Sequence, residues 1–197
     1  GAIVQRQPFG GWKKSAVGAG TKAGGPNYLA GLGDWLPAKA SAEAGITNPG
    51  VRRILNAAGP ALEPADLESV QRALASDAEA WAEEFGTAKD VSGLSAERNV
   101  FRYRHLPVTI RLAEGAPLAH LVRTVAAGVL AGSTLTVSTA VELPAQLRAV
   151  LTALDVDVAV ESDAGWLASA GRLASAGKLS NGRIRLIGGA ASALAEA

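Results

Sequence analysis

The chain has 197 residues, of which 48% are hydrophobic, 19% charged and 5% aromatic, a composition typical of a folded globular protein. It carries 19 Lys and Arg against 18 Asp and Glu, so no basic excess points to nucleic acid or an anionic membrane as a partner. Cysteine and methionine are both absent, which excludes disulfides, thiolate metal sites and a cysteine nucleophile from these residues. Because the chain also begins at Gly1 instead of Met, we expect it to be a piece of a longer protein.

No apolar run reaches the roughly 20 residues that span a bilayer, and no signal peptide is recognisable at the start. We therefore expect a cytoplasmic protein without a transmembrane segment, and the missing cysteines agree with a reducing compartment. The chain ends in a short alanine-rich stretch after Gly189 with no further strand, so we expect the natural C-terminus to lie beyond Ala197.

Residues 1–33 are dense in glycine, which predicts loops with positive φ or close backbone approach after one short strand. Residues 34–94 have a helical pattern and are expected to form a linker region. A short helix is expected after Asn48 and Pro49, and a longer one begins near Pro64 and ends at Gly86. The apolar positions of the longer helix recur at intervals of three and four and are Leu67, Val70, Leu74, Ala78, Trp81 and Phe85. This helix is therefore expected to cover another part of the fold.

Residues 95–197 alternate β-rich runs with helical runs four times. Strands are expected at residues 108–112, 134–138, 156–160 and 183–187, and helices at residues 117–131, 143–154, 164–174 and 190–197. Parallel strands need such crossover connections, and these are overwhelmingly right-handed. The pattern predicts the α/β class, with a Rossmann-like doubly wound parallel sheet over about residues 97–197. Residues 99–104 are expected to add an edge strand.

A doubly wound sheet suggests nucleotide binding, which depends on glycines in the first strand-to-helix turn. That turn, residues 112–117, reads LAEGAP and holds one glycine and the carboxylate of Glu114, which would repel phosphate. The turn after the second strand, residues 138–142, is no better suited, and no acidic residue is placed for a ribose. We therefore expect this half of the chain to bind no dinucleotide itself.

Other chemistry-bearing residues give weak signals. His105 and His120 are far apart in sequence and lack a second ligand at helical spacing, so no metal site is expected. Four carboxylates surround the third strand and could do acid and base work, although strand alternation and a helix N-cap explain them more simply. They are Asp155, Asp157, Glu161 and Asp163. No catalytic residue is expected in the chain.

Two strings in the glycine-rich opening carry a specific resemblance. Residues 7–15 read QPFGGWKKS and residues 22–29 read KAGGPNYL. Together they resemble the C-terminal signature of aldehyde dehydrogenases, and KAGGPNYL narrows the resemblance to the branch that oxidises L-glutamate γ-semialdehyde. Residues 95–197 are more loosely similar to the extra C-terminal domain of the proline utilization A family, a degenerate copy of the aldehyde dehydrogenase nucleotide domain. That family joins proline dehydrogenase to L-glutamate gamma-semialdehyde dehydrogenase.

The resemblance implies that residues 1–33 are the tail of the aldehyde dehydrogenase catalytic module. In the family, backbone N–H groups at the positions of Gly1 and Ala2 hold the α-carboxylate of the substrate; the alternative here is a frayed end. Phe9 would pack against the aliphatic part of the aldehyde, or instead be a core aromatic that pins the glycine loop. The chain departs from the family pattern at Ala16, where glycine is usual, and this puts the local turn in doubt.

The resemblance further implies that the intact protein oxidises proline with FAD and then the semialdehyde to glutamate with NAD. The second step uses a cysteine nucleophile, so this segment alone would be inactive and would hold no cofactor. Its expected contribution is to complete the aldehyde site and to cover the substrate path or support oligomerisation. Expected partners are the rest of its own polypeptide, L-glutamate gamma-semialdehyde and a second copy of the chain in a homo-oligomer. The alternative is a stand-alone, non-catalytic α/β interaction domain.

Overall fold

The structure is a computed structural model that describes residues 10, 32–34, 45–175 and 183–196. The chain divides into two compact units. Residues 83–103 belong to the smaller unit, whereas residues 45–82, 104–175 and 183–196 belong to the larger one. The two units are separate bodies, each with its own sheet.

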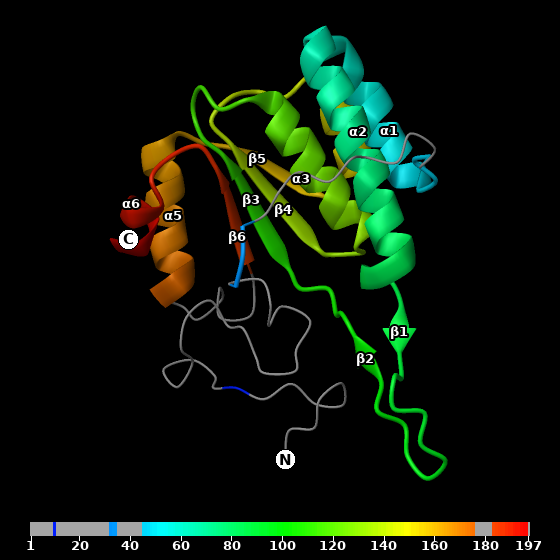
Figure 1. The fold of residues 1–197 in the computed structure, drawn as a ribbon. Coiled ribbons are helices and arrows are strands. Elements are labelled where there is room, and N and C mark those ends of the chain that lie inside the picture. Colours follow the sequence, from blue (N-terminus) through cyan, green and yellow to red (C-terminus); the bar gives the residue numbers. More distant parts are fainter. Residues whose placement is uncertain (1–9, 11–31, 35–44, 176–182, 197) are drawn as a thin grey trace. The chain divides into compact units, whose positions relative to one another are not determined.

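The larger unit is built on a four-stranded sheet whose neighbouring strands are all parallel (Figure 1). The strands are β3 (Val108–Leu112), β4 (Leu135–Thr139), β5 (Asp157–Val160) and β6 (Arg183–Ile187). They lie in the order β5-β4-β3-β6, so the chain steps outward twice from β3 and then returns to its other side. The prediction of an α/β fold with a four-stranded parallel sheet is confirmed.

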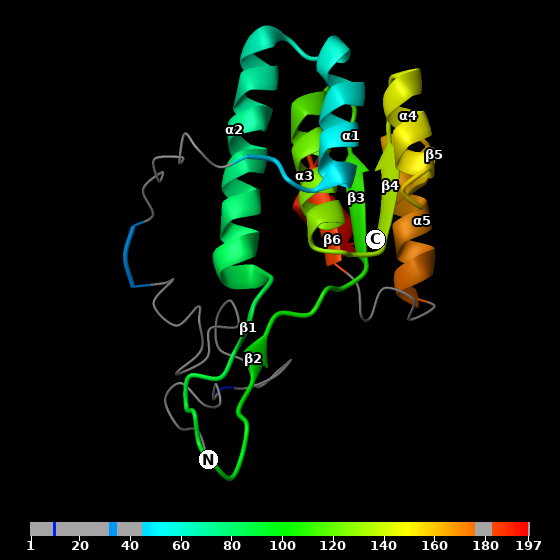
Figure 2. The same cartoon turned by 90° about the vertical axis from the view of Figure 1, so that its right-hand side faces the viewer.

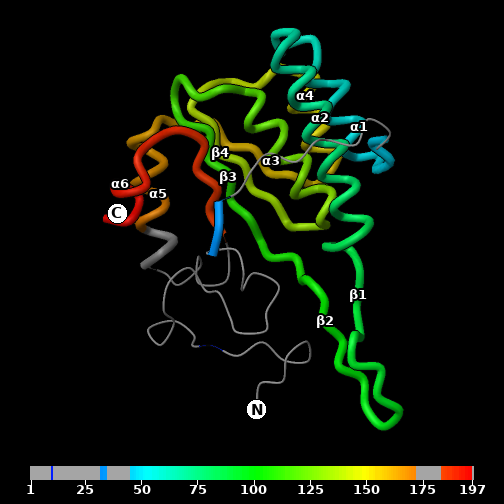
Figure 3. The backbone as a smooth tube through the Cα atoms, in the orientation of Figure 1, coloured from blue at the N-terminus to red at the C-terminus, as the bar shows by residue number. Residues whose placement is uncertain are grey.

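Each strand is followed by a helix, as predicted. These helices are α3 (Leu118–Leu130), α4 (Ala145–Thr152), α5 (Asp163–Ser175) and α6 (Ala191–Glu196). Two further helices, α1 (Pro49–Ala58) and α2 (Pro64–Ala80), precede the sheet in the chain. Figure 2 shows α1, α2 and α3 on one side of the sheet and α5 on the other, and Figure 3 traces the same path. No helix in the described ranges is long and apolar enough to cross a membrane.

Local signals account for the start of both leading helices. The Asn48 side chain accepts a hydrogen bond from the Val51 N–H at 3.1 Å, and Pro49 follows it at the first helical position. Pro64 likewise stands at the start of α2, although Glu63 before it makes no side-chain cap hydrogen bond. Both helices bury apolar side chains with Ile110 of β3, which is fully buried. The longer helix packs against α3 and so covers another part of the fold, as its periodicity predicts.

The end of α2 differs from the prediction. The regular helix ends at Ala80 and continues as a π-helical turn, Trp81–Phe85, before Gly86. The wider π turn moves later side chains off the apolar face, so Phe85 is 44% exposed and not part of the core. Its ring instead meets that of Tyr103 edge-to-face, with centroids 4.9 Å apart.

The prediction of an edge strand at residues 99–104 needs correction. Only β2 (Phe101–Arg102) is a strand, and it pairs antiparallel with β1 (Ala88–Lys89) in a two-stranded sheet of the smaller unit. The cause lies between them: the carboxylate of Asp90 accepts hydrogen bonds from the N–H groups of Ser92, Gly93 and Asn99 at 3.2 to 3.3 Å. This carboxylate folds the chain back, so β2 finds its partner in the segment that precedes Asp90.

Candidate functional site

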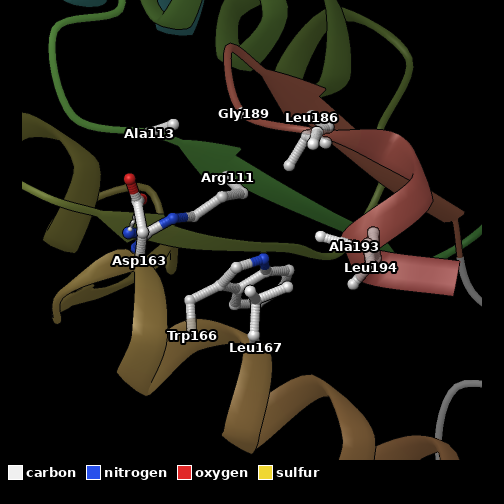
Figure 4. Close-up of a pocket in the computed structure, with 10 residues that line it drawn as sticks. Arg111, Ala113, Asp163, Trp166, Leu167, Leu186, Gly189, Ala193 and Leu194 are labelled. Carbon is white, nitrogen blue, oxygen red and sulfur yellow. Dashed lines mark hydrogen bonds and ion pairs between the residues drawn. The ribbon is translucent and has the colours of Figure 1, made fainter. Parts of the chain in front are cut away.

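A cavity of about 220 Å³ lies at the sheet where the strand order reverses (Figure 4). Its walls come from β3, β6, α5 and α6 and from the turns that follow the two strands. The lining residues are Arg111, Ala113, Asp163, Trp166, Leu167, Leu186, Gly189, Ala190, Ala193 and Leu194. In open parallel sheets, ligands bind at the carboxyl ends of strands beside such a reversal. The position of this cavity matches that rule, and we call it the Arg111–Trp166 pocket.

Strand alternation sends one charged side chain of β3 toward this pocket. Ile110 and Leu112 belong to the apolar core with α1, α2 and α3. Arg111 lies between them and therefore points to the opposite side of the sheet, where α5 lies. Its neighbours across the sheet are Ser138 on β4 and Leu186 on β6. Arg111 is fully buried, which is rare for arginine and requires compensating partners.

Three acceptors surround the guanidinium of Arg111. Nη1 donates a hydrogen bond to Oγ of Ser138 at 2.6 Å. Nη2 donates to the backbone oxygen of Glu161 at 3.1 Å and to Oδ1 of Asp163 at 2.6 Å. The third nitrogen, Nε, is buried and has no hydrogen-bond acceptor among the described residues.

Two carboxylates belong to the cluster around the single positive charge. Asp163 pairs directly with Arg111, and the Ser138 hydroxyl donates to Oε1 of Glu161 at 2.7 Å. The hydrogen bond from Arg111 holds the pKa of Asp163 below its ordinary value, and the N–H of Glu114 adds to this effect while partial burial opposes it. The guanidinium charge is thus already neutralised by groups of the protein.

Trp166 brings a second unpartnered donor to the pocket. It lies on the first turns of α5, is 5% exposed, and its indole Nε1 has no acceptor within the described part of the chain. The Arg111 Cζ atom is 5.8 Å from the centroid of the indole ring. Figure 4 shows the two side chains next to each other, with Leu186 and the α6 residues Ala193 and Leu194 on the facing wall. Two N–H donors without acceptors are therefore buried in the side chains beside this apolar cavity.

The turn between β3 and α3 does not fit a dinucleotide. The Glu114 N–H donates to Oδ2 of Asp163 at 3.4 Å, and the Ala116 N–H donates to the oxygen of Ala113 at 3.2 Å. Pro117 stands at the N-cap of α3 and has no N–H to offer. A pyrophosphate needs several free N–H groups at this point, and a carboxylate beside it is repulsive. The residues of this turn are therefore not suited to hold the pyrophosphate of NAD or FAD.

The structure separates the four carboxylates of the sequence analysis. Asp163 pairs with Arg111 and the Glu161 carboxylate joins the same cluster through Ser138, whereas Asp157 is exposed on β5 and Asp155 occupies a turn with φ +56°. The helix cap is Ser162, whose Oγ accepts from the Gly165 N–H at 3.1 Å. Asp163 thus has a partner that the capping explanation does not include.

The remaining predicted site residues are not brought together. Gly1, Ala2 and Phe9 lie outside the described residues, as do both signature strings apart from Gly10. His105 and His120 are exposed. Over residues 45–175 and 183–196, no group of three or more His, Asp or Glu could hold a metal ion.

Arg111 and Trp166 were not singled out by the sequence. A signal exists for Arg111, because a charged residue inside the β-rich run VTIRL (residues 108–112) must either reach solvent or find a buried partner. Trp166 has no such signal, since an aromatic residue on a helix is ordinary core. In comparisons with known proteins, no family model and no curated sequence matches the chain.

Proposed function

We propose that the chain is the C-terminal segment of a bifunctional enzyme that oxidises proline to glutamate, and that its own contribution is non-catalytic. The observation that carries the proposal is the pair of strings QPFGGWKKS and KAGGPNYL at residues 7–15 and 22–29. They resemble the signature of L-glutamate gamma-semialdehyde dehydrogenases within the proline utilization A family. Residues 1–33 would complete the aldehyde site, and residues 95–197 would form the degenerate nucleotide-domain copy of that family.

The geometry of the larger unit supports a non-catalytic role. A doubly wound, Rossmann-like domain that bound a nucleotide would keep the turn after β3 open to phosphate. Here Glu114 and Asp163 bring carboxylates to that turn, and Pro117 removes a donor from the start of α3. A copy that has lost its cofactor can instead serve as a cover for the substrate path or as a subunit contact.

The composition of the chain also supports a non-catalytic role for this segment. Oxidation of an aldehyde by this family begins with attack of a cysteine thiolate on the carbonyl carbon. The 197 residues contain no cysteine, so the nucleophile would come from residues that precede Gly1. NAD would then accept electrons in that upstream module, and FAD would serve the proline step.

Two measurements test the proposal. The reading frame that precedes Gly1 should encode a cysteine-containing dehydrogenase module and a flavin-binding barrel. In that longer protein, removal of residues 95–197 should impair semialdehyde oxidation, transfer of the intermediate or oligomeric state. Unchanged kinetics, transfer and assembly would refute the covering role and favour a stand-alone interaction domain.

A substitution in the opening segment tests the aldehyde site. Phe9→Ala in the longer protein should raise KM for L-glutamate γ-semialdehyde, whereas Phe9→Leu should retain most of the apolar contact. Phe85→Ala, on an exposed aromatic residue of the smaller unit, is the matched control. If the purified 197-residue chain oxidised the semialdehyde with NAD, the assignment of the nucleophile to residues before Gly1 would be wrong.

A further inference from the structure

We propose that strand β2 of one copy of this chain pairs with the edge strand β5 of a second copy, with Arg102 opposite Asp157. Arg102 belongs to the smaller unit of one copy and Asp157 to the larger unit of the other. The pairing rests on the subunit-contact role proposed above and names the surfaces that would serve it, although it needs no particular parent enzyme.

The segment around β2 alternates between basic and aromatic side chains. Arg98, Arg102 and Arg104 are exposed, and in an extended chain these even positions share one face. Phe101 and Tyr103 between them are half-buried, with ring centroids 5.2 Å apart. None of the three arginines forms an ion pair within the described part of the chain. This face therefore offers uncompensated positive charge to a partner.

The strand β5 is the acidic counterpart. Three of its four residues, Asp157, Ala159 and Val160, are exposed, whereas strands of parallel sheets are ordinarily buried on both faces. The helix α5 packs on α6 and lines the pocket at β3 and β6, so it leaves β5 uncovered. Over the described ranges, Asp157 forms no ion pair and only β4 lies beside β5. The outer edge of β5 is therefore open to another strand.

Charge decides which of these edges can pair. Two copies of β2 would bring arginines together, and two copies of β5 would bring aspartates together. Like charges directly opposite one another in a sheet are destabilising, so each edge is protected against pairing with itself. Pairing of β2 with β5 joins opposite charges instead, which selects this combination.

The hairpin of β1 and β2 is too small to be stable by itself. Each strand has two residues, and an isolated two-stranded hairpin is marginal in water, whereas a third strand adds stability. Large apolar side chains are also exposed in this unit, at 39 to 58% for Phe85, Val91, Leu94 and Val100. A third strand beside β2 would cover part of this apolar surface.

One antiparallel register suits both faces of the pair. With Arg102 opposite Asp157, Phe101 lies opposite Val158, so an aromatic ring meets a half-buried β-branched side chain on the other face. Antiparallel pairing is more stable per residue than parallel pairing, and an antiparallel strand at the edge of a parallel sheet is common. We therefore expect β2 to run antiparallel to β5.

Exchange of the two charges between separate variants tests the contact. Arg102→Glu and Asp157→Arg each place like charges opposite one another. Either variant alone should therefore self-associate at least about tenfold more weakly than the parent chain in sedimentation equilibrium. In an equimolar mixture, β2 of each variant meets an opposite charge on β5 of the other. The mixture should therefore associate with about the affinity of the parent chain.

Controls separate this contact from a general effect of charge. Arg102 and Asp157 are both exposed, so circular dichroism should show that the two variants fold like the parent chain. Arg185→Glu makes the same charge change on β6, the other edge of the sheet, and should leave association unchanged. Association of the parent chain should weaken as the salt concentration rises, because salt screens exposed charges.

Disulfide trapping tests the register. The chain contains no cysteine, so introduced cysteines react without competition. In the proposed register Val100 lies opposite Ala159, at a Cα separation of about 4.5–5.5 Å that suits a disulfide. A mixture of Val100→Cys and Ala159→Cys chains should form a mixed disulfide under mild oxidation. Val141→Cys, at another exposed valine, is the control and should not couple to Val100→Cys.

Four results would overturn the proposal. They are a parent chain that stays monomeric up to about 1 mM, a mixture of charge variants that associates no better than each variant alone, loss of association in Arg185→Glu, and absence of the mixed disulfide. None of these results bears on the upstream dehydrogenase module. Absence of that module would contradict the proposed function and leave this contact standing.

Discussion

Arg111 on β3 and Asp163 at the start of α5 form an ion pair with very unequal exposure. The Nη2 to Oδ1 distance is 2.6 Å, the arginine side chain is 0% exposed, and the aspartate side chain is 46% exposed. The arginine cannot regain water if its partner is lost, whereas the aspartate can. The pair therefore ties the first turn of α5 to the centre of the sheet, and its two members should respond differently to substitution.

Replacing Asp163 with Ala should destabilise the chain by about 3 kcal/mol, near the lower end of the range for breaking a buried pair, because the aspartate is half exposed. Chemical unfolding at neutral pH measures this change. The exposed pair between Glu68 and Arg72 is the control, and Glu68→Ala should cost under about 1 kcal/mol. The double variant Arg111→Leu with Asp163→Ala should recover part of the loss. No recovery would show that the uncompensated charge of Arg111 is not the cause.

Stability should depend on pH through Asp163. Its pKa in the folded chain is below the ordinary 3.8, chiefly because of the hydrogen bond from Arg111. Between the lowered pKa of the folded chain and the ordinary pKa of the unfolded chain, the unfolded chain binds more protons, so the free energy of unfolding falls as the pH falls. The contribution is complete above 3.8 and is lost as the pH drops through the lower folded value.

Unfolding curves from pH 7 down to about pH 3 check this sign for the parent chain and for Asp163→Asn. The variant should show a smaller decline below about pH 4, since it no longer titrates at this position. Equal declines for the two proteins would contradict the assignment.

Gly128→Ala should destabilise the chain although alanine favours helices. A Cβ at residue 128 on α3 would lie 2.7 and 2.9 Å from the two methyl carbons of Leu135, which is itself 2% exposed on β4. The helical preference of alanine contributes about 1 kcal/mol, whereas overpacking of a buried contact costs about 1–3 kcal/mol. We expect a net loss of about 1 kcal/mol in chemical unfolding.

The same contact predicts coupling between the two positions. Leu135→Ala removes the methyl groups that a new Cβ would meet, so the double variant should be more stable than the sum of the single changes implies. Gly45→Ala is a control, because a Cβ there meets nothing within 4 Å. Strict additivity of the two changes would mean that Leu135 is not the obstacle.

Asp90→Ala should loosen the connection between β1 and β2. Its Oδ1 accepts from the N–H groups of Ser92 and Gly93, and Oδ2 accepts from that of Asn99. Hydrogen exchange at these three amides should become faster, and exchange in α3 should stay unchanged. Asp90→Asn keeps one acceptor oxygen and should give an intermediate result. If these three amides exchanged as slowly in the Asp90→Ala variant as in the parent chain, other contacts would hold this turn.

The elements of the larger unit follow from patterns that act over a few residues. The β-rich run at residues 108–112 forms a strand with those bounds, and Asn48 with Pro49 begins α1. The expected edge strand failed because its pairing depends on Asp90, about ten positions earlier in the chain. Periodicity predicts that a segment is a strand, but a hydrogen-bond partner decides which sheet it joins.

The residues of the Arg111–Trp166 pocket could not be brought together from the sequence. Ser138 and Asp163 lie 27 and 52 positions from Arg111, so no local pattern links the three. Glu161 and Asp163 were visible as carboxylates after a strand, but their cation and the indole beside it were not. Composition, alternation and turn residues decided the α/β class, the parallel strands and the unsuitability of the first turn for phosphate. Only the order β5-β4-β3-β6 decided which side chains share the pocket, because strands that are distant in sequence become neighbours through hydrogen bonds of the folded backbone.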